Sequence, residues 1–255
     1  MSRIHEAFEG KKAFVAFLTA GDPDFETSVK NFKAVAAAGA DLIEVGIPFS
    51  DPIAEGPVIQ EADIRALSAG MTTDRVFELV KEVRKEVKIP MVFMTYANPV
   101  YHYGLDWFFA KTAEVGIDGI IIPDAPFEES NEFSSVAEKY GVDVISMIAP
   151  TSEDRIREIA STAKGFIYVV SSLGVTGVRS EITTDLSGIL SAIKEVTDVP
   201  AAIGFGISTP EQARKMSAYA DGVIVGSAMV RIVAEKGKAA PEALAEYVKS
   251  MKAVL

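Results

Sequence analysis

The sequence predicts an α/β protein, a single-domain (β/α)8 TIM barrel over residues 1–255 with extra N-terminal and C-terminal helices. Its 255 residues match the roughly 250 residues of a typical barrel. Short apolar runs alternate with amphipathic segments, which is the order of an α/β fold. The runs are almost continuously apolar, as parallel strands covered on both faces are. No Gly-x-Gly-x-x-Gly string follows the first run, which disfavours an open sheet that binds a dinucleotide.

Eight apolar runs are expected to form the strands, and the segments between them with helical spacing are expected to form helices. Several runs follow a similar signal that ends in Asp, which marks the junction between a helix and a strand. The predicted strands are Ala13–Leu18, Asp41–Gly46, Pro90–Thr95, Gly119–Ile122, Asp143–Ile148, Phe166–Val170, Pro200–Gly204 and Gly222–Val225. The predicted helices include Phe25–Ala38, Thr73–Val87, Asn131–Tyr140, Ser152–Thr162, Asp185–Val196 and Pro210–Ala218, with Arg3–Glu9 and Pro241–Ala253 at the two ends.

The composition excludes several classes of partner. The chain has 25 Lys and Arg against 36 Asp and Glu, a formal net charge of −11, and so acidic a surface repels nucleic-acid phosphates. There is no cysteine, which excludes disulfides and thiolate sites and fits a reducing compartment. The first residues lack the apolar core of a signal peptide, and no apolar stretch approaches about 18 residues. We expect a cytoplasmic protein without a nucleic-acid or membrane partner.

The predicted second strand carries the clearest candidate for catalysis, Glu44. Because strand residues alternate between faces, Glu44 shares a side with Leu42 and Gly46 and should point into the barrel near its top. Barrel enzymes carry their reactive groups there. Burial of an unpaired carboxylate is costly and raises its pKa, which suits a general acid–base group. Pairing with a buried Lys or Arg is the alternative, but the strand runs contain neither.

Two further acids, Asp51 and Glu55, stand in the loop that follows this strand, residues 48–57. Asp51 precedes a proline, which is an ordinary arrangement in turns. Glu55 has an equally ordinary interpretation as a solvated loop charge. The residues alone leave both options open.

Small residues follow the predicted seventh and eighth strands. The chain reads Gly-Phe-Gly-Ile-Ser over 204–208 and Val-Gly-Ser-Ala over 225–228, and a helix begins at Thr209–Pro210. Small residues let backbone N–H groups approach an anion, and a helix N-terminus adds a favourable dipole. These loops are where barrel enzymes frequently hold phosphate. The placement predicts a phosphate site, although glycines also mark plain turns.

Other loop residues have two interpretations each. The loop over 171–182 is long and contains two glycines, so it either closes over substrate or is an ordinary mobile loop. Tyr168, near the end of the sixth strand, either donates a hydroxyl to the pocket or simply packs. His5 and His102 have no metal-ligand spacing to another residue, so we expect no metal. The aromatic residues of Asn98–Gly104 either fold onto the barrel or contact a partner.

Six motifs together resemble the alpha subunit family of tryptophan synthase. The string Glu-x-Gly-x-Pro-Phe-Ser-Asp-Pro is highly specific to that family, and the motifs occur in family order over essentially the whole chain. They are Phe17–Pro23, Ile43–Pro52, Gly56–Gln60, Leu173–Gly177, Gly204–Ser208 and Val225–Ala228. The resemblance implies a carbon–carbon lyase of tryptophan biosynthesis, which cleaves indole-3-glycerol phosphate to indole and glyceraldehyde 3-phosphate by a retro-aldol reaction.

The resemblance also implies roles for individual residues. Glu44 matches the catalytic glutamate, which handles protons at indole C3 and at the adjacent glycerol hydroxyl. Glu55 matches a second catalytic acid that is Asp in the family, so this chain departs by one methylene, and a misplacement of about 1 Å can cost on the order of 100-fold in rate. The substrate-binding matches are Phe17 at the indole, Tyr168 in the pocket, Thr176 in the lid, and Gly177, Gly206, Gly226 and Ser227 around the phosphate.

A partner is implied as well. In the family the alpha subunit caps a beta subunit and passes it indole within an αββα heterotetramer. Pyridoxal phosphate belongs to the beta subunit, so no cofactor is expected in this chain. The side facing the partner matches Asp51, Asn98, Pro99 and Tyr101. Two alternatives stay open, namely a stand-alone indole-glycerol-phosphate lyase and a non-catalytic activator of a beta subunit.

Overall fold

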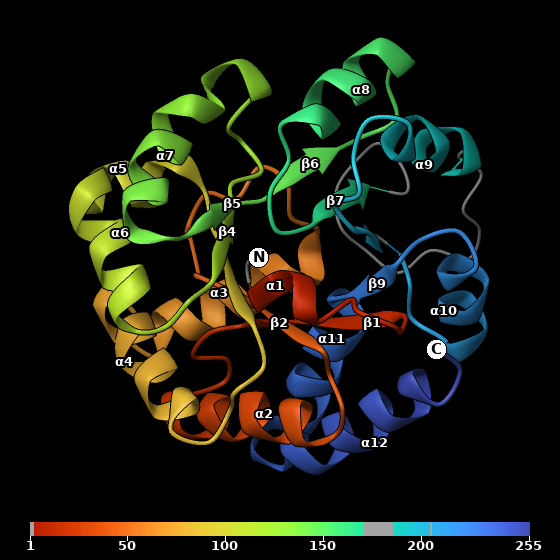
Figure 1. The fold of residues 1–255 in the computed structure, drawn as a ribbon. Coiled ribbons are helices and arrows are strands. Elements are labelled where there is room, and N and C mark those ends of the chain that lie inside the picture. The colour runs from red at the N-terminus through yellow and green to blue at the C-terminus, as the bar shows by residue number, and fades with distance from the viewer. Residues whose placement is uncertain (1–2, 171–185, 205) are drawn as a thin grey trace.

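The computed structural model describes residues 3–170, 186–204 and 206–255, in which strands and helices alternate (Figure 1). The strands are β1 Ala13–Thr19, β2 Leu42–Gly46, β3 Met91–Met94, β4 Gly119–Ile121, β5 Asp143–Val144, β6 Ser146–Ile148, β7 Ile167–Val170, β8 Ala201–Gly204 and β9 Gly222–Val225. The α-helices are α1 Arg3–Glu6, α2 Phe25–Ala37, α3 Pro57–Ser68, α4 Thr73–Arg84, α5 Ala97–Tyr103, α6 Leu105–Glu114, α7 Ser130–Ala137, α8 Glu153–Ser161, α9 Leu186–Lys194, α10 Pro210–Ser217, α11 Ser227–Lys236 and α12 Ala240–Lys252. Short 3-10 helices are η1 Phe127–Glu129, η2 Glu138–Tyr140 and η3 Gly237–Ala239.

The strands form one parallel sheet in the order β5-β4-β3-β2-β1-β9-β8-β7-β6. The two ends of this order, β5 and β6, are consecutive in the chain and are separated only by Ile145. The predicted fifth strand is therefore one interrupted run, which pairs with β4 through its first half and with β7 through its second half. The sheet closes on itself at this run, and the predicted TIM barrel is confirmed.

Strand residues alternate between two separate apolar cores. Inward side chains such as Phe17 and Leu42 form one cluster inside the barrel. Outward side chains such as Ile43 and Val45 pack with the surrounding helices in a second cluster. The alternation predicted for the second strand is thus confirmed, because the two neighbours of Glu44 in the chain belong to the outer cluster.

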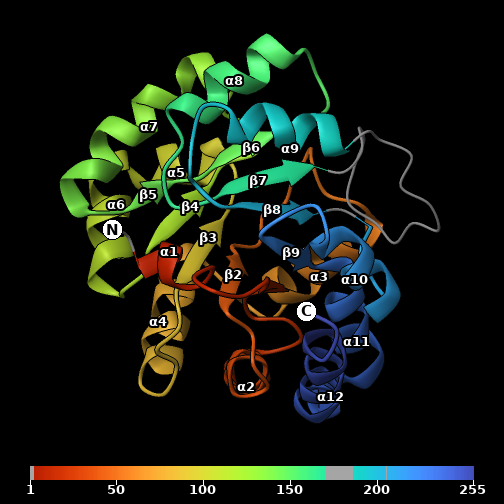
Figure 2. The same ribbon diagram turned by 45° about the vertical axis from the view of Figure 1, so that its right-hand side comes forward.

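Helix α1 closes the end of the barrel at which the strands begin. Ile4, Ala7 and Phe8 are buried in the inner cluster, and α1 lies over the middle of the ring of strands (Figure 1). The other helices lie around the outside of the barrel. Helices α2 and α12 pack side by side at the bottom of the view in Figure 2, and α7, α8 and α9 lie at its top. With one end closed by α1, the loops that follow the strands are left to build a site at the other end.

Aspartates placed just before strands cap the start of a neighbouring strand. The carboxylates of Asp41, Asp118 and Asp221 accept the backbone N–H groups of Phe14, Met91 and Ala201 at 2.8, 2.9 and 3.0 Å. These donors stand at or next to the first residue of their strands. The recurring Asp of the predicted junctions therefore has a structural role. Asp143 breaks the pattern, since its Oδ2 is buried without a hydrogen-bond partner among the described residues.

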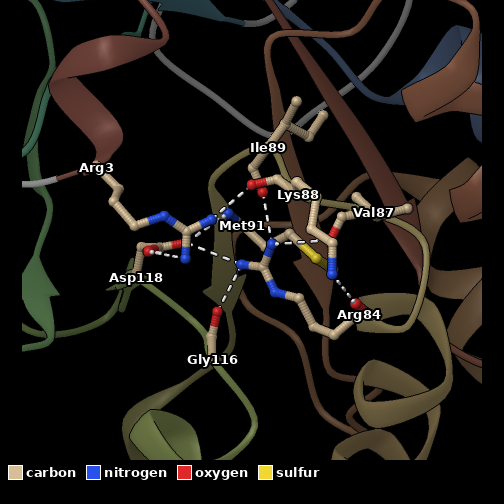
Figure 3. A network of polar contacts seen from close by, with 8 residues as sticks. All are labelled: Arg3, Arg84, Val87, Lys88, Ile89, Met91, Gly116 and Asp118. Carbon is tan, nitrogen blue, oxygen red and sulfur yellow. Dashed lines mark hydrogen bonds and ion pairs between the residues drawn. The ribbon is translucent and has the colours of Figure 1, made fainter.

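Arg84 at the end of α4 ties several turns together at this same end (Figure 3). Its guanidinium donates to the carbonyls of Ile89 and Gly116 at 2.6 and 2.5 Å and to the carboxylate of Asp118 at 2.9 Å. Arg3 of α1 forms an ion pair with Asp118 at 3.2 Å. The side chains of Arg84 and Asp118 are only 13% and 10% exposed, so their attraction is weakly screened by water and stabilises the closed end.

The prediction named no helix at α3, α6 or α11 and treated most of α5 as a loop. Pro57 stands at the first position of α3, directly after a Glu-Gly pair that reads as a loop. Proline is tolerated there because its missing N–H has no partner in the first turn. Helix α5 is too short for an amphipathic period to show, and it carries Pro99 in its first turn.

We predict that Asp118→Ala lowers the free energy of unfolding by about 3 kcal/mol, because removal of one partner leaves a largely buried charge uncompensated. Urea denaturation measures the loss. Glu82→Ala is the matched control, since it breaks only the exposed Lys85–Glu82 pair, for which we expect a loss below about 1 kcal/mol. Equal losses in the two variants would contradict the structural role of Asp118.

Candidate active site

A narrow cavity lies at the carboxyl ends of the strands. Of the nine predicted catalytic and substrate-binding residues, Thr176 and Gly177 lie outside the described residues, and the other seven all line this cavity. Its free volume is about 30 Å³, which is room for roughly one water molecule. The lining residues are Phe17, Glu44, Glu55, Ile59, Met94, Tyr168, Gly206, Ile224, Gly226 and Ser227.

A larger groove of about 890 Å³ lies beside α7 and α8. Its lining includes Arg155, whose ion pair with Glu128 is exposed. None of the predicted catalytic or phosphate-binding residues lines it. Chemistry therefore favours the narrow cavity over the wider groove as the active site.

Glu44 points into the barrel from the middle of β2. It pairs in register with Phe17 of β1 and Val92 of β3, and only 1% of its surface is exposed. Its Oε2 has no hydrogen-bond partner among the described residues. Burial raises the pKa of Glu44 to about 8, with the nearby Glu55 carboxylate as the second cause. At neutral pH this carboxyl group holds a proton that it can donate and take back.

Glu55 is buried rather than solvated, with 4% of its surface exposed. Its backbone carbonyl accepts a hydrogen bond from the Gln60 side chain at 2.7 Å, which joins the end of the loop to the first turn of α3. Its carboxylate is near enough to Glu44 to raise the pKa of that group. The interpretation of Glu55 as a solvated loop charge is therefore wrong.

The structure adds two residues that sequence reasoning missed, Asp63 and Tyr96. Asp63 lies on the buried face of α3, four residues after Ile59, and Tyr96 follows β3. The Tyr96 hydroxyl accepts the Ala54 N–H at 3.1 Å, and burial and then the Glu55 carboxylate raise its pKa. Helical spacing from Ile59 is a signal that finds Asp63, provided that α3 is recognised as a helix.

Glycines allow the two aromatic residues of the cavity to lie close to the backbone. A Cβ atom on Gly46 would lie 2.7 Å from Cζ of Phe17, and one on Gly204 would collide with the Tyr168 hydroxyl. Tyr168 is buried, and burial and then the Glu44 carboxyl raise its pKa far above the ordinary value. Phe17 thus packs against β2, which carries Glu44, and Tyr168 packs against β8.

The two predicted phosphate turns differ in whether side chains already cap the backbone N–H groups at the start of the following helix. Helix α10 is closed by its own capping box, in which Thr209 and Gln212 satisfy each other's backbone N–H groups. Helix α11 begins after Gly226, which provides no side-chain cap. Gly206 has a φ of 83°, a backbone conformation that favours glycine. Of these two helix starts, that of α11 at Ser227 is therefore the one without a side-chain cap.

The residues predicted to face a partner lie on the outer rim. Asp51 is exposed, as is Asn98, and Pro99 is half-buried in the first turn of α5. Tyr101 is exposed, but its ring packs on Phe133 with centroids 5.2 Å apart and its hydroxyl donates to Glu132 at 2.5 Å. The ring of Tyr101 therefore folds onto its own barrel, as one interpretation of this segment predicted. Its exposed surface still leaves room for the partner contact that the other interpretation predicted.

No three His, Cys, Asp or Glu side chains within the described ranges come close enough together to hold a metal ion. No helix of residues 3–170, 186–204 and 206–255 is long and apolar enough to cross a membrane.

A parallel barrel that holds an inward carboxyl group with a raised pKa at its mouth belongs to the class of TIM-barrel enzymes that work by acid–base chemistry. The particular family comes from comparison with known proteins. The family model described as "Tryptophan synthase alpha chain" matches residues 4–254. The chain belongs to the tryptophan synthase alpha chain family.

Individual relatives agree with the family model. The tryptophan synthase alpha chain of Lacticaseibacillus casei is 51% identical over 99% of this chain and 95% of its own length. The crystal structure of the alpha chain from Legionella pneumophila has a TM-score of 0.88 and 36% identity, and covers 100% of this chain and 97% of that one. A tryptophan synthase complex from Pyrococcus furiosus has a TM-score of 0.86 and 37% identity, and covers 94% and 97%. The predicted family and its carbon–carbon lyase activity are confirmed.

We predict that Glu44→Gln stabilises the protein increasingly as the pH rises. The pKa of Glu44 is about 8 when folded, against 4.5 for an ordinary Glu, so the unfolded chain releases this proton first. The native state then loses up to about 1.4 kcal/mol per pH unit between these two values. Glutamine does not titrate and removes this loss.

Chemical denaturation at pH 5 and pH 8 measures the effect. Glu61→Gln is the control, because Glu61 is an exposed acid on α3. A stability difference between Glu44→Gln and the wild type that is the same at both pH values would show that Glu44 titrates normally.

Proposed function

We propose that this chain cleaves indole-3-glycerol phosphate in the narrow cavity, with Glu44 as the acid–base group. The observation that carries the proposal is the inward, buried carboxyl of Glu44 beside a second carboxylate. Indole is a poor leaving group until C3 is protonated and the ring becomes an indolenine. A carboxyl group that is protonated at neutral pH is suited to this first proton transfer.

The proposed cycle returns every proton that it uses. Glu44 donates its proton to indole C3, and the resulting carboxylate accepts the proton of the adjacent glycerol hydroxyl. The hydroxyl oxygen forms a carbonyl while the bond between C3 and the glycerol carbon breaks, and that electron pair restores the indole ring. Glu44 is protonated again at the end, so cleavage needs no further acid or base.

The other cavity residues bind the two ends of the substrate in this proposal. The Glu55 carboxylate stabilises the positive charge that develops at the indole N–H, and Phe17 and Tyr168 pack on the ring. The phosphate binds at Gly206, Gly226 and Ser227, where the uncapped start of α11 favours an anion. Thr176 and Gly177 belong to the proposed lid and phosphate turn, but lie outside the described residues.

We also propose that the rim around Asp51 and α5 binds a beta subunit. The similar Pyrococcus furiosus structure is a tryptophan synthase complex. Ile53, two residues after Asp51, is 72% exposed, and exposed apolar side chains favour a protein contact. Asn98, Pro99 and Tyr101 complete the proposed contact surface. Pyridoxal phosphate would belong to that partner. For this chain itself, the proposal includes a single domain and a cytoplasmic location.

Glu44→Gln tests the proposal directly. The substitution removes the titrating proton but little shape, so we predict a loss of cleavage by about 1,000-fold or more with little change in substrate affinity. Indole release measures cleavage, with and without a beta subunit, and equilibrium binding of the substrate measures affinity. A variant that cleaves at the wild-type rate would contradict the role of Glu44. Full wild-type turnover that is unchanged by the beta subunit would favour a stand-alone lyase.

A further inference from the structure

Tyr96 is a buried tyrosine whose hydroxyl meets the loop that carries Glu55, and the cycle above gives it no role. It stands between β3 and the first residue of α5, and only 4% of its surface is exposed. A buried tyrosine hydroxyl usually has a hydrogen-bond partner. In this chain it has two partners, and they are consecutive residues of the loop.

The hydroxyl of Tyr96 both accepts and donates a hydrogen bond in this loop. Its oxygen accepts the backbone N–H of Ala54 at 3.1 Å. Its proton is donated to the side-chain carboxylate of Glu55. Because a tyrosine hydroxyl has a single proton to donate, that proton is directed at the carboxylate. The Tyr96 hydroxyl thus joins the backbone of one loop residue to the side chain of the next.

The ring of Tyr96 is held by contacts that do not involve the hydroxyl. It packs on the ring of Phe49, which belongs to the same loop as Glu55, with centroids 5.5 Å apart. The backbone beside it is also fixed, because the N–H of Ala97 donates to the carboxylate of Asp124 at 2.8 Å. The hydroxyl therefore presents its proton from a fixed position, and phenylalanine can replace Tyr96 without loss of these contacts.

Glu55 has a longer side chain to restrain than the acid that the family resemblance gives for this position. It has one methylene more than Asp, and each further rotatable bond increases the number of places that the carboxylate can occupy. The Gln60 side chain holds the backbone carbonyl of Glu55 at 2.7 Å, but that contact does not set the side-chain torsions. The hydrogen bond from Tyr96 acts on the carboxylate itself.

We propose that Tyr96 is a positioning residue for Glu55. Its hydroxyl fixes the carboxylate beside the cavity that Glu55 lines together with Glu44, and so holds it in place against the indole N–H. This inference rests on the proposed function, because Glu55 is assigned there to the substrate. Burial, followed by the Glu55 carboxylate, raises the pKa of Tyr96 far above its ordinary value, so the hydroxyl keeps the proton that it donates.

Tyr96→Phe tests the inference, since it removes one hydroxyl and keeps the ring. Glu55 acts in the proposal on charge that develops during the reaction, so a displaced carboxylate should lower kcat more than substrate affinity. We predict a loss of about tenfold or more in kcat and a KM within about twofold of the wild type. Tyr103→Phe is the matched control, because its hydroxyl donates to Asp74 at 2.6 Å and neither residue lines the cavity. It should leave both constants unchanged.

A double-mutant cycle separates positioning of Glu55 from a general structural effect. Tyr96→Phe also removes the acceptor of the Ala54 N–H, and that loss occurs whether or not a carboxylate stands at position 55. In a Glu55→Ala background, Tyr96→Phe should therefore lower kcat by less than about threefold. An equal loss of kcat in both backgrounds would overturn the inference, as would a Tyr96→Phe variant that keeps the wild-type kcat.

A measurement without substrate tests the same hydrogen bond. Tyr96→Phe should lower the urea midpoint of the wild type, and should lower that of Glu55→Ala by less, because the carboxylate that accepts the bond is absent there. Equal shifts in the two backgrounds would contradict the inference even if Glu55→Ala turns over too slowly for the kinetic cycle. A wild-type chain that cleaves no substrate would instead contradict the proposed function, and the urea cycle would still test the contact between Tyr96 and Glu55.

Discussion

The interior of the barrel is apolar, and the rest of the site depends on one carboxyl group placed inside it. Side-chain alternation along β2 puts Leu42 and Glu44 on the same inward face, while Ile43 and Val45 pack against the helices. Parallel strands have no free face that could turn Glu44 towards water. The burial of its carboxyl group is therefore a consequence of the fold, and the raised pKa follows from the burial.

The two ends of the barrel use charged groups in opposite ways. At the end where the strands begin, Asp118 is paired with Arg84 and Arg3, and these pairs hold turns together. At the other end, carboxyl groups face each other and the described residues offer them little positive charge, which favours the protonated form. Paired carboxylates stabilise the fold. The unpaired acids lower the stability of the fold, but they can exchange protons near neutral pH.

The sequence predicted those features that follow from a local period or a specific motif. Two-residue alternation placed Glu44 correctly, and the motifs placed Phe17, Tyr168, Gly206 and the Gly226–Ser227 turn at one cavity. Features that arise from tertiary packing could not be predicted in this way. Asp63 differs from the solvated acid Glu61 two residues earlier by its helical spacing from Ile59. That spacing is informative only once α3 is recognised as a helix. The break at Ile145 likewise depends on which neighbouring strand each half pairs with.

The most direct test of the central claim is infrared difference spectroscopy of the wild type against Glu44→Gln across pH, since the difference isolates the carboxyl group of Glu44. The wild type is predicted to show the C=O band of a protonated carboxyl at pH 6, and that band should fade only as the pH passes about 8. A carboxylate signal from Glu44 already at pH 6 would contradict the account.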